Sequence, residues 1–394
     1  MEQWKEYRLG DLCTISSSKR IFAKEYVNEG IPFYRGKEII QLHKGEEISD
    51  HLYISKVRYS EIRNKYGVPK VGDILLTSVG TLGIPYIIKH SDFYFKDGNL
   101  TSFYNFKNIR NTYLYYWFCS KYGKSQIDKI AIGSTQKALT INSLSEILIQ
   151  IPPFKVQDKI VDILKSLDSK IDLNRKINSN LEEQAKALFK SWFIDFEPFK
   201  GGKFVESELG KIPEGWEVCP LEQLGKFKRG KTIVAKEAKK GDIPVVAGGI
   251  DPAYYNNVAN TKGPVITVSA SGANAGFMRL YYQDVWASDC SFLDSSNENL
   301  LWIYCFLNNN RRVLRHAQTG AVQPHVKPAD INSISVCIPP HDLISKFQNT
   351  ISPLFKSIGL HQKETKRLQE TRDALLPKLM SGEIDVEHSK LLFI

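Results

Sequence analysis

The chain has 394 residues, 42% of them hydrophobic, and it carries 53 Lys and Arg against 43 Asp and Glu, a net charge of +10. This length exceeds one ordinary hydrophobic core and predicts two or more domains. The sequence has no run of 18 apolar residues and no signal peptide, which predicts a cytoplasmic protein without a membrane span. The positive charge favours a polyanionic partner without requiring one. Six scattered cysteines, none in a Cys-x-x-Cys pair, predict buried thiols in place of disulfides or a zinc site.

In chain order, the sequence first shows a mixed domain of short strands and one helix, then a long helix, and then repeats both. Landmarks near the start of the unit recur 212 residues later and those near its end 187 residues later, so the second copy lacks about 25 residues from its middle. Such a duplication predicts a pseudo-two-fold molecule, which suits a two-sided ligand such as duplex DNA. The early landmarks are Trp4, Leu9, Leu12, Ile31-Pro32 and Gly36, repeated as Trp216, Leu221, Leu224, Ile243-Pro244 and Gly248; the late ones are Gly133-x-x-Gln136 and Ile151-Pro152-Pro153, repeated as Gly320-x-x-Gln323 and Ile338-Pro339-Pro340.

The mixed domains show β-rich runs broken by Gly, Pro and Asn, followed by an apolar helix. We therefore predict an α+β fold, with tandem mixed domains separated by two long antiparallel coiled-coil helices. The predicted segments are domain 1 at 1–153, helix 1 with a connector at 154–200, domain 2 at 201–340, and helix 2 with a short tail at 341–394. The predicted strands lie at 72–77, 84–88, 93–95, 264–268 and 284–286, and the predicted domain helices lie at 112–121 and 300–308.

Both long helices carry residues at a regular 4,3 spacing, which is a heptad stripe. In each helix the stripe is apolar at the ends and polar in the middle, so an antiparallel pair would bring the two polar centres together and penalise other registers. About 39 residues would make a spacer of roughly 58 Å. The alternative is two helices that each pack only on their own domain. The stripe residues are Ile160, Leu164, Leu167, Ile171, Asn174, Asn178, Leu181 and Leu188 in the first helix, and Ile351, Leu354, Ile358, His361, Thr365, Leu368, Leu375 and Leu379 in the second.

The sequence offers no catalytic constellation. It has no phosphate-binding G-x-x-x-x-G-K-[ST] loop, no H-E-x-x-H and no G-x-S-x-G. An adenine methyltransferase would show Asn-Pro-Pro-aromatic, and here Ile151 takes the place of the Asn. The small-residue loop from Gly272 to Gly276 is interpreted as a turn. We therefore predict no catalytic residue, cofactor or metal in this chain.

Four stretches resemble the specificity subunit of type I restriction-modification systems, along nearly the whole chain. These are residues 4–12 (WKEYRLGDL), 151–153 (IPP), 188–193 (LFKSWF) and 374–384 (ALLPKLMSGEI). The resemblance implies a non-catalytic reader of double-stranded DNA, in which each mixed domain reads one half of a bipartite site. It implies that the helices set the spacer and dock two modification (methyltransferase) subunits, with two ATP-dependent restriction subunits added for cleavage. S-adenosylmethionine, ATP and Mg²⁺ would then be held by those partners.

Candidate DNA-contacting residues lie on polar or Gly-containing breaks at matching places in the two copies, where Arg, Asn or Gln can reach base edges and Lys, Ser or Thr can reach phosphates. The ordinary interpretations are solvated charges for the Lys and Arg residues and strand-end hydrogen bonds for Ser78 and Ser269. For His361 the ordinary interpretation is a polar layer between helices, and for Trp192 it is a position in the core or in a subunit interface. The candidates are Ser17, Lys19, Arg20, Arg35, Lys37, Ser78, Thr81, Gln136 and Lys137 in copy one, and Lys228, Arg229, Lys231, Ser269, Ser271, Asn274, Gln323 and His325 in copy two.

The sequence also leaves two other functions open. A methyltransferase or nuclease acting alone would bind S-adenosylmethionine or a metal through this chain, although no motif supports this. A structural adaptor would use the coiled coil to join proteins and would show no sequence preference on DNA, with salt sensitivity equal at all sites.

Overall fold

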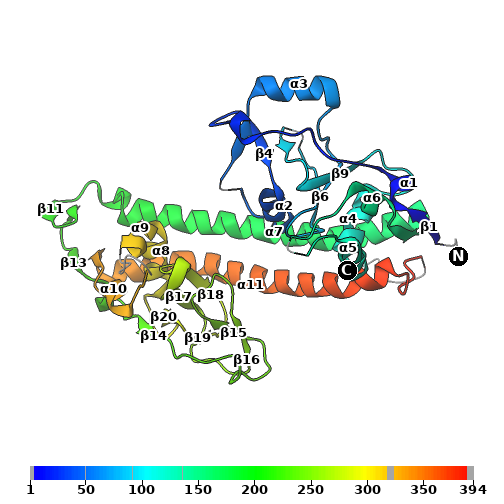
Figure 1. Cartoon of the computed structure of the whole chain (residues 1–394). Coiled ribbons are helices and arrows are strands. Elements are labelled where there is room, and N and C mark those ends of the chain that lie inside the picture. The colour runs from blue at the N-terminus through cyan, green and yellow to red at the C-terminus, as the bar shows by residue number, and fades with distance from the viewer. Residues whose placement is uncertain (1–3, 49, 91, 135, 317–323, 388–394) are drawn as a thin grey trace. The chain divides into compact units, whose positions relative to one another are not determined.

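The computed structural model describes residues 4–48, 50–90, 92–134, 136–316 and 324–387 (Figure 1). The chain forms two compact units: unit 1 is Met1–Leu173 with Glu364–Ile394, and unit 2 is Asn174–Lys363. The boundary crosses both long helices, so each unit combines one mixed domain with one half of each helix. The units therefore differ from the four predicted segments, which separate the helices from the domains.

Unit 1 is built on two four-stranded sheets. One has the strand order β2-β9-β6-β7 and the other β3-β5-β4-β8, while β1 pairs with β10. Strand β6 is apolar along its length because both its faces are covered: Ile74 and Leu76 enter one core cluster and Leu75 another. The described strands are β1 (Lys5–Arg8), β2 (Thr14–Ser16), β3 (Tyr26–Val27), β4 (Ile31–Tyr34), β5 (Leu52–Ile54), β6 (Ile74–Thr77), β7 (Pro85–Ile87), β8 (Tyr94–Phe95), β9 (Leu100–Tyr104) and β10 (Leu148–Ile151). The described helices of the mixed domain are α1 (Leu9–Leu12), the 3₁₀ helix η1 (Ala23–Glu25), α2 (Gly36–Lys44), α3 (Lys56–Tyr66), α4 (Asn111–Cys119), α5 (Lys121–Ile130) and α6 (Ile141–Ser145).

Unit 2 repeats the first of these sheets with the order β14-β20-β17-β18, and it has a three-stranded sheet in the order β16-β15-β19. The pair β13–β21 takes the place of β1–β10. The described strands are β11 (Phe204–Ser207), β12 (Gly210–Pro213), β13 (Glu217–Pro220), β14 (Lys228–Arg229), β15 (Ile243–Val246), β16 (Tyr254–Asn256), β17 (Val265–Ser269), β18 (Met278–Tyr281), β19 (Trp286–Ala287), β20 (Cys290–Asp294) and β21 (Ser335–Ile338). The described helices are η2 (Glu197–Phe199), η3 (Leu221–Gln223), η4 (Gly272–Asn274), α8 (Leu300–Asn309), α9 (Arg311–His316) and α10 (Pro328–Asn332).

The residues missing from the second copy correspond mainly to two helices. In unit 1, α2 lies between β4 and β5, and α3 lies between β5 and β6. In unit 2 the equivalent connections, residues 247–253 and 257–264, are fully described and contain no helix. In Figure 1, α3 lies at the edge of unit 1 farthest from its long helix. The duplicated sheet is thus common to both units, and the helices α2 and α3 are additions of unit 1.

Two 40-residue helices, α7 (Phe154–Phe193) and α11 (His341–Met380), occupy the predicted positions. In unit 1, Ile160 and Leu164 of α7 share a core with Leu376 and Leu379 of α11. In unit 2, Phe189 of α7 packs against Phe347 of α11, with their ring centroids 5.7 Å apart. Residue numbers rise along one helix as they fall along the other, so the contacts in each unit are antiparallel. The helices contact each other within each unit, which excludes the alternative of two independently packed helices.

The stripe predicted from the sequence faces inward. All sixteen of its residues are buried or half-buried. In its polar centre the Oδ1 of Asn178 lies 2.9 Å from the Nδ1 of His361, a polar contact between the two helices. Asn174 is fully buried and Thr365 is half-buried. Trp192 packs on Phe347 with ring centroids 5.7 Å apart, which is the first of its two predicted environments, a core position.

The segment from Phe193 to Gly215, whose Gly and Pro residues indicate a connector from helix 1 into domain 2, and the short tail after Gly382 have more structure than predicted. Residues 193–215 include the hairpin β11–β12, and Phe196 and Phe199 each place a ring 5.3 Å from that of Trp216. After Gly382, Val386 is 3% exposed within the core of unit 1. Apolar contacts hold both segments, and the pattern was missed because a few isolated apolar residues show no period. None of the helices in the described residues is both long enough and apolar enough to span a bilayer.

Candidate nucleic-acid interface

In unit 1, four loops meet beyond the end of strand β6. The amide of Ser78 donates to the carbonyl of Asn99 at 2.8 Å, which joins the loop after β6 to the turn before β9. The amide of Gly80 donates to the carbonyl of Lys137 at 3.4 Å, which adds the Gly-x-x-Gln loop. The amide of Gly98 donates to the Oγ of Ser17 at 3.3 Å, which adds the segment after β2. The polar breaks singled out from the sequence are therefore neighbours at one end of one sheet.

The Gly-x-x-Gln loop depends on its glycine. Gly133 has φ +96°, and a Cβ built on it would lie 2.5 Å from the carbonyl oxygen of Gln136. The loop can close this tightly only without a side chain at that position. Gln136 and Lys137 are both exposed. The shared glycine thus has a structural role, while the exposed side chains remain available to a ligand.

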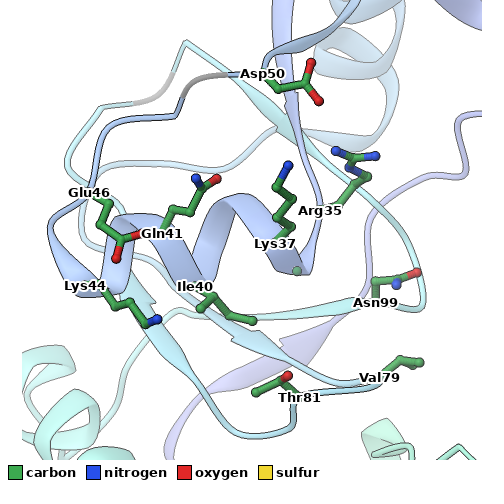
Figure 2. Close-up of a pocket in the computed structure, with 11 residues that line it drawn as sticks. Arg35, Lys37, Ile40, Gln41, Lys44, Glu46, Asp50, Val79, Thr81 and Asn99 are labelled. Atoms are coloured by element: carbon green, nitrogen blue, oxygen red, sulfur yellow. The ribbon is translucent and has the colours of Figure 1, made fainter. Parts of the chain in front are cut away.

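Beside these loops, helix α2 lines an open cavity of about 670 Å³. Figure 2 shows Lys37 and Gln41 extending from one side of α2 toward Asp50, with Val79, Thr81 and Asn99 on loops at the other side of the helix. Among the predicted residues, the cavity brings together Arg35, Lys37 and Thr81. The lining residues are Arg35, Gly36, Lys37, Ile40, Gln41, Lys44, Glu46, Asp50, Val79, Thr81 and Asn99.

Local chemistry explains why α2 forms here. The Oε2 of Glu38 accepts a hydrogen bond from the amide of Arg35 at 2.7 Å, which caps the first turn. Gly45 ends the helix with φ 74° in the left-handed region. Burial favours a higher pKa for the Glu38 carboxyl, but hydrogen bonds from Arg35 and from the backbone outweigh it and lower that pKa. Arg35 also donates from Nη2 to the Oε1 of Glu38 at 2.7 Å, so its charge is already paired within the domain.

Three further candidates of copy one follow strand β2. Ser17 and Lys19 are exposed, and the Nζ of Lys19 lies 5.0 Å from the ring centroid of Tyr66. Arg20 is exposed, but its Nε lies 2.7 Å from the Oδ2 of Asp97. Arg20 therefore fits the ordinary interpretation, a solvated surface charge, better than Lys19 does.

Ser78 and Ser269 are buried inside their domains. The Oγ of Ser78 lies 2.7 Å from the Oγ1 of Thr101, and the Oγ of Ser269 donates to the carbonyl of Gly248 at 3.1 Å. With exposed fractions of 2% and 3%, neither hydroxyl can reach a ligand from outside. Both residues therefore fit the ordinary interpretation, a hydrogen bond at the end of a strand. We leave them out of the candidate interface.

The two serines are also not equivalent to each other. Thr77 pairs with Leu100 at the end of β6, and Ser269 pairs with Cys290 at the end of β17, so Ser269 occupies the position of Thr77. The counterpart of Ser78 is Ala270, whose carbonyl accepts from Val326 as that of Ser78 accepts from Leu139. The predicted match between the copies was one residue out of register here.

In unit 2 the equivalent end of the sheet is organised by Asp289, which takes the place of Asn99. Its Oδ1 lies 2.6 Å from the Nη2 of Arg229, and its Oδ2 accepts from the Oγ of Ser271 at 2.6 Å. Ser271 in turn forms an isolated antiparallel bridge with His325. Three candidates from distant parts of copy two are thus brought together, although the acidic residue between them was not predicted.

The other candidates of copy two lie around this cluster. Lys228 is exposed on the edge strand β14, and Lys231 is exposed beyond it, with its carbonyl accepting from the Nε1 of Trp286 at 2.7 Å. Asn274 is half-buried at the end of η4, the predicted turn. Gln323 lies outside the described residues.

Sequence reasoning missed Gln41, Lys44, Asn99 and Asp289. The first two sit on α2, and a signal for that helix was present in Glu38, three residues after Arg35, and in Gly45 at the end. Asn99 and Asp289 become functional candidates only through contacts with residues far away in the chain. No local pattern marks them.

Comparisons with known proteins agree with this two-unit organisation. The family model for the type I restriction modification DNA specificity domain matches residues 1–183 and 213–370. The chain is similar to the type I restriction enzyme MjaIX specificity subunit of Methanocaldococcus jannaschii, at 31% identity over 98% of this chain and 94% of that protein. It is also similar to the HindI specificity subunit of Haemophilus influenzae, at 25% identity over 98% of this chain and 100% of the relative. The crystal structure of an S subunit from M. genitalium has the same fold, with a TM-score of 0.58, 19% identity and 96% of each chain covered. The chain belongs to the type I restriction-modification DNA specificity family.

Proposed function

We propose that this chain is the non-catalytic specificity subunit of a type I restriction-modification complex. It binds double-stranded DNA, and each mixed domain reads one half of a bipartite site. The observation that carries this function is the double match of the DNA specificity family, once over each mixed domain. The repeated sheet supports it, because polar loops cluster at the same end of β2-β9-β6-β7 and of β14-β20-β17-β18.

The finer assignment concerns partners and cofactors. We infer that the long helices set the spacing of the half-sites and dock two modification subunits, and that two restriction subunits complete the cleaving form. In this scheme the chain itself holds no cofactor. S-adenosylmethionine is bound by the modification subunits, and ATP with Mg²⁺ by the restriction subunits. The inward-facing stripe supports the helical part, because the remaining helix surface is left for partners.

The test is co-expression with the cognate methyltransferase subunit, followed by genome-wide mapping of N6-methyladenine by long-read sequencing. We expect one split motif with a fixed non-specific gap. Replacing residues 1–150 with the corresponding domain of a relative should then change one half of the motif only. A stable complex with an active methyltransferase that leaves no motif would contradict the proposal and support the adaptor.

A further inference from the structure

Helix α2 is anchored in unit 1 by one face and presents polar side chains, together with Ile40, on the other. Glu38 and Ile39 are 1% and 0% exposed, and Ile39 belongs to a core cluster against which Leu42 also packs. Lys37, Gln41 and Lys44 are spaced by four and three residues, so they share the opposite face, and all three line the cavity. The helix is therefore held rigidly from behind while its polar face stays open.

The chemistry of the cavity differs from that of a phosphate site. A phosphate site offers donors throughout, whereas this cavity also contains the carboxylates of Glu46 and Asp50 and the amides of Gln41 and Asn99. A mixture of donors and acceptors matches the edges of bases in the major groove, which present both. That groove is about 12 Å wide and admits an α-helix.

We propose that α2 enters the major groove of the half-site read by unit 1, and that Gln41 is a specificity-determining residue that selects adenine at one base pair. This inference rests on the proposed function. A glutamine amide can accept from the N6 amino group of adenine and donate to its N7 at the same time, which no other base permits. Lys37 and Lys44, one turn to either side, supply donors to neighbouring guanines or phosphates.

The proposal gives a role to α2, which unit 1 has and the described connections of unit 2 lack. Residues 247–253 replace α2 in unit 2 and contain no helix, and the basic Arg229 there is held by Asp289 on the sheet edge. The two units therefore present different elements to DNA from the same sheet. The half-site of unit 1 is read by a helix, and that of unit 2 by the edge strand β14 and the loops beside it.

The experiment uses the complete complex of this chain with its methyltransferase partner. Motifs are mapped for the wild type and for Gln41→Ala and Gln41→Glu, and affinities are measured on duplexes in which each base pair of the site is varied. Asn64→Ala is the matched control, because Asn64 is an exposed amide on α3, the other added helix, and does not line the cavity. Thermal melting of each complex verifies that the variants are folded.

We expect Gln41→Ala to relax one position of the unit 1 half-site and to weaken binding to the wild-type site roughly 5- to 150-fold. Gln41→Glu should shift the preference at that position from adenine toward cytosine, whose N4 amino group donates to a carboxylate. The other half-site and the Asn64→Ala motif should be unchanged.

Unchanged motifs and affinities in both Gln41 variants, with a clear wild-type motif, would overturn the inference and leave the proposed function standing. An equal loss of affinity on every duplex would also overturn it, because a phosphate contact carries no base preference. A wild-type complex that yields no motif would instead remove the proposed function and this inference with it.

Discussion

The two mixed domains share a sheet and differ in what surrounds it. The strand order is the same in β2-β9-β6-β7 of unit 1 and β14-β20-β17-β18 of unit 2. At the equivalent end of these two sheets, however, Asn99 of unit 1 corresponds to Asp289 of unit 2, and Ser17 corresponds to Arg229. The buried strands conserve apolar character between the units, while the loops at their ends change chemistry. A duplicated frame of this kind allows each copy to acquire its own ligand preference without changing its core.

The seam between the helices and each domain shows the same divergence at positions that are half-buried in unit 1 and buried in unit 2. In unit 1, the hydroxyl of Tyr116 donates to Asp168 at 2.8 Å, and Arg372 pairs with Asp168 at 2.8 Å. At the positions 187 residues away in the repeat, unit 2 has Phe355 and Ala185, which are 3% and 1% exposed. One unit therefore closes the seam with an ion pair and the other with apolar packing.

The largest effect is expected at the aromatic end of this seam. Phe347 is fully buried among Phe189, Trp192 and Phe193. We expect Phe347→Ala to lower the free energy of unfolding of unit 2 by about 3–5 kcal/mol, because it deletes a large ring from a packed core. Urea unfolding followed by tryptophan fluorescence would measure this. Leu360→Ala, at a position 68% exposed, should stay within about 0.5 kcal/mol of the wild type, and equal effects of the two changes would contradict the packing described.

A smaller effect is expected at the ion pair of unit 1. Arg372→Met leaves the half-buried carboxylate of Asp168 without its cation and should cost about 1–3 kcal/mol of unfolding free energy. The double change Asp168→Phe with Arg372→Ala places the residues of unit 2 at these two positions and should recover part of that loss, because an apolar replacement removes the unpaired charge although the hydroxyl of Tyr116 loses its acceptor. Chemical denaturation of the three proteins measures both steps. A double variant less stable than Arg372→Met would show that the two seams are not interchangeable.

The third prediction concerns DNA affinity in unit 2. Asp289 fixes Arg229 and Ser271 by two contacts of 2.6 Å, so Asp289→Asn, which supplies the residue found in unit 1, should release the guanidinium. Because Arg229 then loses its fixed orientation, we expect binding to the cognate site to weaken roughly five- to tenfold, with the loss confined to base pairs of the unit 2 half-site. Competition binding on duplexes varied in one half-site at a time measures this. If the loss of affinity were confined to base pairs of the unit 1 half-site, the assignment of the two half-sites to the two domains would be wrong.

Long periodic features could be predicted from sequence because each residue carries the same local signal. The stripe from Ile160 to Leu188 and its repeat satisfy one spacing, and the structure buries or half-buries every member. Among the residues that the structure describes, the matching of the two copies fails in the middle, where deletions shift the offset from 212 to 187. Ser78 was compared with Ser269 when its counterpart is Ala270, and in a strand a slip of one residue exchanges the two faces.

The candidate interface was predicted in outline and not in its details. The exposed positions of Lys37, Thr81 and Lys137 follow from polar breaks between strands, and the structure places them near one another. The pairing of Arg20 with Asp97, 77 residues away, removes a charge that the sequence offers as available. Asp289 is the converse case: nothing in the sequence marks it, and it becomes a candidate only through its contacts with Arg229 and Ser271. Such contacts depend on the tertiary fold, which no local spacing encodes.

The smallest expected effect links the added helix α2 to pH. His43 at the end of α2 is half-buried, and its Nδ1 lies 2.8 Å from the carbonyl oxygen of Pro85. Burial lowers the pKa of His43 below its ordinary value of 6.5, with Lys124 and Arg372 adding to that direction against Pro85 and Asp168. The unfolded chain therefore takes up a proton at a pH where the folded chain does not. The stabilisation is present above about pH 6.5 and is lost as the pH falls through the folded pKa.

Between pH 7 and pH 5, we expect the free energy of unfolding of unit 1 to fall more steeply in the wild type than in the His43→Gln variant. The difference between the two slopes should be less than about 1.4 kcal/mol per pH unit. The variant keeps an N–H donor for Pro85 and removes the titration. Urea unfolding of both proteins at pH 7, 6 and 5 gives the difference, and the transition of unit 2 serves as the internal reference. Identical pH dependence in the two proteins would mean that His43 titrates alike in the folded and unfolded chain. The contact between α2 and strand β7 would then be independent of pH. The position of α2, the helix proposed to enter the major groove, would then not depend on pH either.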